Sequence, residues 1–188
     1  MPRVVGIDPG LTRLGIGVVD TTGQTQRLVH YSVLRSAPEM SIEHRLMKLG
    51  REVEAAIDEH APDAIALERV FAQQNLHSVM GVAQVSGIVL RAAAERDIPI
   101  VMLTPTEVKA AVTGYGAAEK AQVAEMVRRL LRLAEAPKPA DAADALALAI
   151  THGRAVVRTG AVRRDSGSQP TPAQKAWAAA EAQAKRRR

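Results

Sequence analysis

Two aspartates three residues apart, Asp141 and Asp144, stand out among the side chains that could do chemistry. They open a run of Ala, Leu and Ile that favours a helix, and residues three apart on a helix project from the same face. Two adjacent carboxylates on an otherwise apolar helix repel one another, so the pair favours a bound cation. A plainer interpretation stays open, in which Asp141 is the N-cap and Asp144 stabilises the first helical turn.

Two further acids stand where short apolar strands are predicted to end. Asp8 closes the run 3–8, and Glu68 closes the continuous apolar run 64–68. Ligands of helix-covered sheets tend to lie at strand ends, so both acids are candidate site residues. The alternatives are that Asp8 only begins an Asp-Pro-Gly turn and that Glu68 only pairs with Arg69.

Together the four acids predict one kind of metal chemistry. The sequence has no Cys and no cluster of His, which excludes disulfides, thiolate catalysis and sites for soft metals. Carboxylates alone favour Mg²⁺ or Mn²⁺. Two such ions held by crowded carboxylates are typical of phosphoryl transfer, so we expect in-line hydrolysis of a phosphodiester.

Three other residues are candidates for contacts with nucleic acid. Phe71 is one of four aromatic residues among Phe, Tyr and Trp, and it follows Glu68 closely in a stretch rich in amides, as a stacking or wedging residue would. The alternative is a Phe71 tucked under its own loop. Lys109 and Lys120 flank the Gly114–Gly116 segment and could bind phosphates, or could be ordinary solvated lysines.

The hydrophobic pattern predicts an α/β domain that positions these residues. Strands are expected at 3–8, 14–20, 28–34, 64–68 and 98–103, and helices at about 41–60, 76–94, from 104, 119–133 and from 140. Gly15 and Gly17 leave one face of the second strand bare, which suits a close approach by backbone or ligand. The helix at 76–94 is apolar nearly all round, so we expect a second copy to cover part of it in a two-fold homodimer.

Charge divides the chain into two parts. From Arg154 onward there are nine Lys and Arg against two acids, so this end accounts for the whole net charge of +5. We expect a nuclease domain at 1–157 and a basic tail at 158–188 that either holds polyanions or only aids solubility. No apolar run is long enough for a membrane span and no signal peptide is evident, so a cytoplasmic protein is expected.

Six segments, in order, resemble the RuvC family of bacterial Holliday junction resolvases, the crossover junction endodeoxyribonucleases. They are residues 6–10 (GIDPG), 66–71 (ALERVF), 80–87 (MGVAQVSG), 104–109 (TPTEVK), 114–120 (GYGAAEK) and 141–147 (DAADALA), within a match over 3–152. The resemblance implies a ribonuclease H-like fold with a five-stranded mixed sheet flanked by helices. It also implies a Mg²⁺-dependent, homodimeric endonuclease that resolves four-way DNA junctions by paired symmetric nicks in DNA recombination and repair.

The resemblance also implies roles for individual residues. Asp8, Glu68, Asp141 and Asp144 would be the catalytic ligands of two Mg²⁺ ions, which Mn²⁺ can replace. Phe71 would contact the unstacked junction centre, and Lys109 and Lys120 would assist at the DNA backbone, Lys120 also in catalysis. The helix at 76–94 would form the dimer interface, and a branch-migration helicase complex of the RuvA and RuvB type would be a partner.

One departure and three rivals remain. Ser86 stands where relatives commonly have arginine, which puts one phosphate contact in doubt. Actin-like ATPases share the Asp-x-Gly turn but need two lobes and a second glycine-rich loop. RNA-processing nucleases of related fold differ by contacts to 2′-hydroxyls that the sequence does not reveal. A junction-binding module without catalysis would be expected to lose its acids first, and all four are present.

Overall fold

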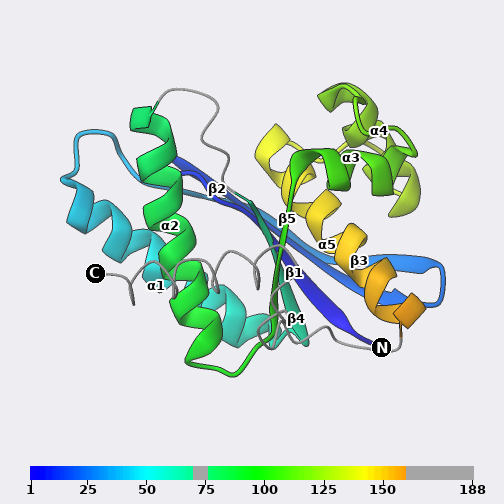
Figure 1. Ribbon diagram of the computed structural model, residues 1–188, viewed down its shortest axis with the longest axis horizontal. Helices are drawn as coiled ribbons and strands as arrows, with labels where there is room; N and C mark the ends of the chain where they lie inside the picture. Colours follow the sequence, from blue (N-terminus) through cyan, green and yellow to red (C-terminus); the bar gives the residue numbers. More distant parts are fainter. Residues whose placement is uncertain (70–75, 160–188) are drawn as a thin grey trace, which may run out of the picture.

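A single five-stranded sheet carries helices on both faces (Figure 1). The structure, a computed structural model, describes residues 1–69 and 76–159 of the 188-residue chain. In chain order the elements are β1 (Arg3–Asp8), β2 (Arg13–Thr22), β3 (Thr25–Arg35), α1 (Ile42–His60), β4 (Ala64–Glu68), α2 (Leu76–Ala94), β5 (Ile100–Leu103), α3 (Pro105–Thr113), α4 (Lys120–Leu130) and α5 (Ala140–Thr159). Phe71 and nearly all of the predicted basic tail lie outside the described residues.

The strands lie in the order β3-β2-β1-β4-β5, which confirms the predicted five-stranded mixed sheet. β1, β2 and β3 form an antiparallel meander, whereas β4 and β5 run parallel to β1. β2 and β3 are longer than predicted because their pairing continues to Thr22 and Thr25, where Gly23 closes the turn with a φ of 55°. The last strand begins two residues later than predicted, because the Ile98 amide instead bonds the Ala93 carbonyl at the end of α2.

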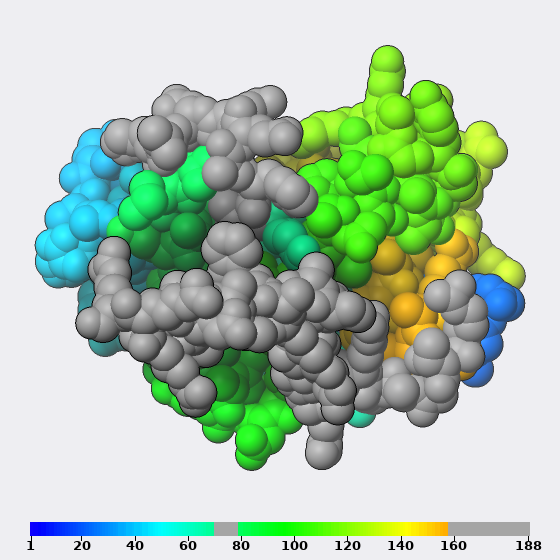
Figure 2. Space-filling model, viewed as in Figure 1, coloured from blue at the N-terminus to red at the C-terminus, as the bar shows by residue number. Residues whose placement is uncertain are grey.

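Two hydrophobic cores lie on the two faces of the sheet. One packs β-strand side chains such as Val5 and Ile7 against α1 and α2, and the other packs Val4 against α3, α4 and α5. This division follows from the alternation of side chains along β1. In the space-filling view, α3 and α4 form one shoulder of the molecule and α1 lies at the opposite side (Figure 2).

Glycines in β1 and β2 have no side chain on the face that α5 covers, so the backbone of α5 packs directly against these strands. A Cβ on Gly6 would be 2.0 Å from the Ala145 carbonyl oxygen, and one on Gly17 would be 2.6 Å from the Leu146 amide nitrogen. The expected close approach at the second strand is therefore confirmed, and what approaches is the α5 backbone. This packing fixes the first turn of α5 relative to the ends of the strands.

Among the residues that the structure describes, helix α2 is packed on one side and exposed on the other. Val85 and Val89 are fully buried in the core beneath α1, whereas the Met80 side chain is 59% exposed and Leu90 is 37% exposed. The remaining apolar surface is what a second copy would have to cover if the predicted dimer forms. Within the described residues, no helix is both long and apolar enough to cross a membrane.

Candidate active site

Asp8 and Glu68 meet because their strands are parallel neighbours. The β1–β4 pairing places Ile7 beside Leu67, so the next residue of each strand is a carboxylate at the same edge of the sheet. The two carboxyl groups lie close enough for each to shift the pKa of the other. Among the described residues no ion pair joins Arg69 to Glu68, and the Arg69 guanidinium instead donates to the Met102 carbonyl at 3.5 Å.

The first turn of α5 brings the two aspartates to the same edge. The helix begins at Ala140, so Asp141 is its second residue and the N-cap assignment is wrong, although Asp141 does lie in the first turn. Gly15 lies opposite Asp8 in the β1–β2 pairing, and a Cβ there would be 2.1 Å from the Asp141 carbonyl oxygen. Because Gly15 has no side chain, the start of α5 packs against β2 beside Asp8.

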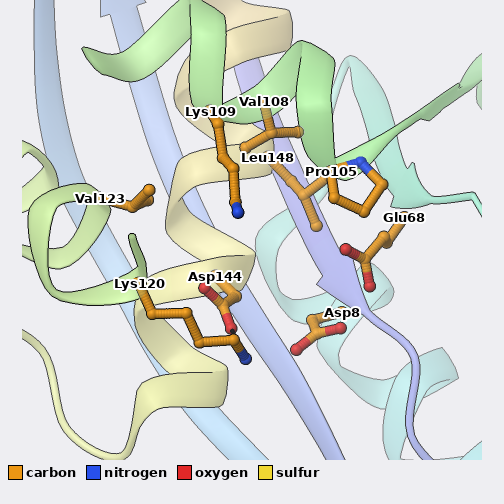
Figure 3. Close-up of a pocket in the computed structure, with 9 residues that line it drawn as sticks. All are labelled: Asp8, Glu68, Pro105, Val108, Lys109, Lys120, Val123, Asp144 and Leu148. Carbon is orange, nitrogen blue, oxygen red and sulfur yellow. Dashed lines mark hydrogen bonds and ion pairs between the residues drawn. The ribbon is translucent and has the colours of Figure 1, made fainter. Parts of the chain in front are cut away.

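A small cavity of about 110 Å³ collects three of the four acids. Figure 3 shows Asp8, Glu68 and Asp144 directed into it from β1, β4 and α5, with the amino group of Lys109 above them and that of Lys120 beside Asp144. Apolar side chains complete the wall, namely Pro105, Val108, Val123 and Leu148. The space exceeds the roughly 10–15 Å³ that one water requires, so hydrated ions or a phosphate oxygen can enter.

The cavity raises the pKa values of Asp8 and Glu68. Burial, and then the charge of Glu68, raise the pKa of Asp8, with further contributions from Asp144 and Asp141. Burial likewise raises the pKa of Glu68. Both shifts favour the protonated carboxyl, and a cation bound between the two acids would oppose them by stabilising the ionised form.

Two basic side chains balance the helix aspartates. Lys120 at the start of α4 places its Nζ 3.3 Å from Asp144 Oδ2, and this charge is the main reason that the pKa of Lys120 is raised. Arg13 at the start of β2 places its Nη1 3.9 Å from Asp141 Oδ2. Arg13 was not expected from the sequence, although it lies two residues before Gly15 and therefore on the strand face that α5 covers.

The four carboxylates suit hard divalent cations, although they are not arranged around a single point where an ion could bind. All four groups are carboxylates, the preferred ligands of Mg²⁺ and Mn²⁺. In the described part of the chain, no three Asp, Glu or His side chains are already gathered around one point where an ion could bind. Asp141 and Asp144 each lie beside a basic side chain, whose positive charge competes with a cation for the same carboxylate.

The structure places the other residues that were considered for contacts with DNA in different positions. Lys109, on α3, points toward the cavity (Figure 3), and the start of its helix is fixed by a capping box between Thr104 and Glu107. Ser86 is buried and its hydroxyl donates to the Val82 carbonyl at 2.9 Å, so it offers no phosphate contact. Phe71 lies outside the described residues.

Comparison with known proteins identifies what this arrangement resembles. The sequence profile described as Crossover junction endodeoxyribonuclease RuvC matches residues 4–152. The RuvC of Leifsonia xyli subsp. xyli is 54% identical over 95% of this chain and 91% of its own length. The RuvC of Nocardioides sp. is 59% identical over 80% of this chain and 85% of its own.

Solved structures agree with the sequence matches. A Thermus thermophilus RuvC structure in complex with Holliday junction substrate superposes with a TM-score of 0.80 at 38% identity, covering 85% of this chain and 97% of that one. The yeast mitochondrial Holliday junction resolvase Ydc2, at 15% identity and a TM-score of 0.55, covers 85% of this chain and 86% of its own and shares the fold alone. The fold is thus the predicted ribonuclease H-like resolvase fold, and this chain belongs to the RuvC family of crossover junction endodeoxyribonucleases.

Proposed function

We propose that this chain resolves four-way DNA junctions by hydrolysing one phosphodiester in each of two opposed strands. The observation that carries this proposal is the meeting of Asp8, Glu68 and Asp144 from three separate elements in one cavity, with Lys120 beside them. Asp141 lies close enough for its charge to raise the pKa of Asp8. The Thermus thermophilus relative bound to a Holliday junction supports the choice of substrate.

We further propose that the four carboxylates hold two Mg²⁺ ions, with Mn²⁺ as a substitute. When bound, such ions supply a hydroxide nucleophile and stabilise the leaving oxygen of an in-line displacement. Asp8 and Glu68 would hold the ions from the strand ends, and Asp141 and Asp144 would hold them from α5, where Arg13 and Lys120 now lie beside the two aspartates. The Lys120 amino group, at the mouth of the cavity, then contributes positive charge where negative charge develops on the phosphate.

The remaining contacts in the proposal concern the junction itself. Lys109 points into the same cavity and binds the DNA backbone near the cut strand. Phe71 contacts the unstacked junction centre, a role that rests on the sequence resemblance. Residues 1–157 act as the nuclease domain, and the basic tail 158–188 holds DNA without sequence preference.

Assembly follows from the symmetry of the substrate. A four-way junction offers two equivalent strands for cutting, so two copies related by a two-fold axis suit it. The exposed apolar side of α2, with Met80 and Leu90, supports a homodimer through this helix. A branch-migration complex of the RuvA and RuvB type is the proposed partner, and a bacterial enzyme acting on chromosomal DNA works in the cytoplasm.

The first experiment is a cleavage assay on a synthetic junction that can migrate over several base pairs. Linear duplex and an RNA–DNA hybrid are run in parallel, each with Mg²⁺ and with EDTA. We expect paired, symmetric, ligatable nicks in the junction alone, with Mg²⁺ alone. Asp8→Asn should abolish cutting and leave junction binding largely intact, since binding depends on cationic contacts and shape.

A matched control makes the result specific. Asp97→Asn removes the same charge from an exposed position with a φ of 52°, a conformation that asparagine tolerates, and should cut normally. Binding without nicks by the wild-type protein would identify a junction-binding module. Cutting of the hybrid would move the function to RNA processing, and equal loss of binding in Asp8→Asn would contradict the assigned role of Asp8.

A further inference from the structure

Arg13 is held at the edge of the carboxylate cluster by the strand that also seats α5. It is the first residue of β2, and Gly15 and Gly17 follow on the same face of that strand. Those glycines contact the backbone of α5, so the Arg13 side chain projects just beyond the start of the helix. Its Nη1 lies 3.9 Å from Asp141 Oδ2, while the side chain stays 54% exposed.

Asp141 differs from the other three acids in its surroundings, because it lies beside Arg13 and does not line the cavity. Asp8 and Glu68 line the cavity together, and Asp144 pairs with Lys120 at its wall. Asp141 is not part of that wall, and the partner that the structure gives it is Arg13. The positive charge of this guanidinium opposes a second cation at Asp141.

A DNA phosphate is a suitable competitor for the guanidinium. Exposed ion pairs are weak, so the Arg13–Asp141 pair opens easily. Arginine binds phosphate with two parallel hydrogen bonds, which favours transfer of its side chain to a strand lying across the cavity. The 54% exposure of Arg13 leaves the guanidinium accessible to such a strand.

We propose that Arg13 is a positioning residue that couples DNA binding to metal binding. In the free protein it neutralises Asp141 and opposes ion binding there, and in the complex it moves to a phosphate and releases Asp141 as a ligand. The coupling is reciprocal, so each partner strengthens binding of the other. This inference rests on the proposed function, because it assumes that Asp141 is a metal ligand and that DNA lies over the cavity.

Two binding measurements on the full chain test the proposal without any cleavage. The first is Mn²⁺ affinity of the DNA-free protein by calorimetry, and the second is junction affinity in EDTA by fluorescence anisotropy over a series of salt concentrations. Arg13→Gln should tighten Mn²⁺ binding by about two- to fivefold, the range for losing one exposed ion pair. The same variant should weaken junction binding and lower the magnitude of the salt slope by about 1.

Conservative and control variants separate this role from a structural one. Arg13→Lys retains the charge and should return both affinities toward wild type. Arg35→Gln removes the same charge from the exposed residue that pairs with Arg13 across β2 and β3, and should leave Mn²⁺ affinity unchanged. A general structural defect would weaken both ligands, so opposite shifts in Arg13→Gln are the distinguishing result.

A wrong role for Arg13 and a wrong proposed function would give different binding results. If the wild-type protein binds Mn²⁺ and the junction normally and Arg13→Gln changes neither affinity, or weakens both, the role of Arg13 is wrong while the proposed function stands. If the wild-type protein binds neither Mn²⁺ nor the junction, the proposed function fails and the inference fails with it.

Discussion

Replacing Gly15 by alanine should move the active site without unfolding the protein. The new Cβ would lie 2.1 Å from the Asp141 carbonyl oxygen, whereas a carbon–oxygen contact needs about 3.3 Å. The start of α5 must therefore retreat from β2 by about 1.2 Å, the difference between these distances. Asp141 and Asp144 travel with it, while Asp8, opposite Gly15 on β1, stays.

Such a displacement has two measurable effects. Forcing a methyl group into a packed contact costs about 1–3 kcal/mol of unfolding free energy. Misplacing catalytic groups by about 1 Å costs about 100-fold in rate, so single-turnover junction cleavage at saturating enzyme should fall by that factor. Urea unfolding of the same preparation checks that the variant is folded at the assay temperature.

Gly23→Ala provides the matched control for stability. Gly23 has a φ of 55° with open space around its Cβ position, so alanine costs about 1–2 kcal/mol of backbone strain and leaves the site untouched. Gly23→Ala should then lose comparable stability and cleave at the wild-type rate. The steric reasoning is refuted if Gly15→Ala cleaves normally, or if both variants lose the same rate.

Three further outcomes are expected. Phe71→Ala should slow cutting of intact junctions more than of pre-opened ones, and equal slowing in the two assays would remove Phe71 from the junction centre. Leu90→Glu places a charge on the exposed side of α2 and should convert a dimer into a folded monomer by light scattering; an unchanged mass would place the interface elsewhere. Asp20, buried, accepts hydrogen bonds from Arg3 and Arg27, which hold its pKa below the usual range. Its contribution is present above the pKa of unfolded Asp and is lost as pH falls through the lower folded value. Asp20→Asn should therefore reduce the unfolding free energy by about 1–2 kcal/mol at neutral pH and less in acid, and a pH-independent difference would contradict this.

Much of the site could be predicted from the sequence because its signals are local. Asp8 and Glu68 close apolar runs that are long enough only for strands, and Asp141 and Asp144 share a helix face by their spacing. The ordered motifs then connect these acids to one family. The bare positions Gly15 and Gly17 also predicted a close approach, which the packing of α5 confirms.

Other features depend on contacts between distant segments. Whether Asp141 capped its helix depended on the residue at which the helix begins, and the structure places that start at Ala140. The pairing of Arg13 with Asp141 joins residues 128 positions apart in the numbering, and no local pattern reports such a contact. The raised pKa values of Asp8 and Glu68 arise from burial at the edge where two parallel strands end.

By itself, the sequence determined the types of residue, the order of strands and helices, and the family, because strand and helix periodicity and motif order are properties of neighbouring positions. The tertiary structure decided which acids meet in the cavity, which basic side chain lies beside each helix aspartate, and which side of α2 is left exposed. These depend on distances of a few ångströms between separate elements, and those distances are set only when α5 packs onto the bare face of the sheet.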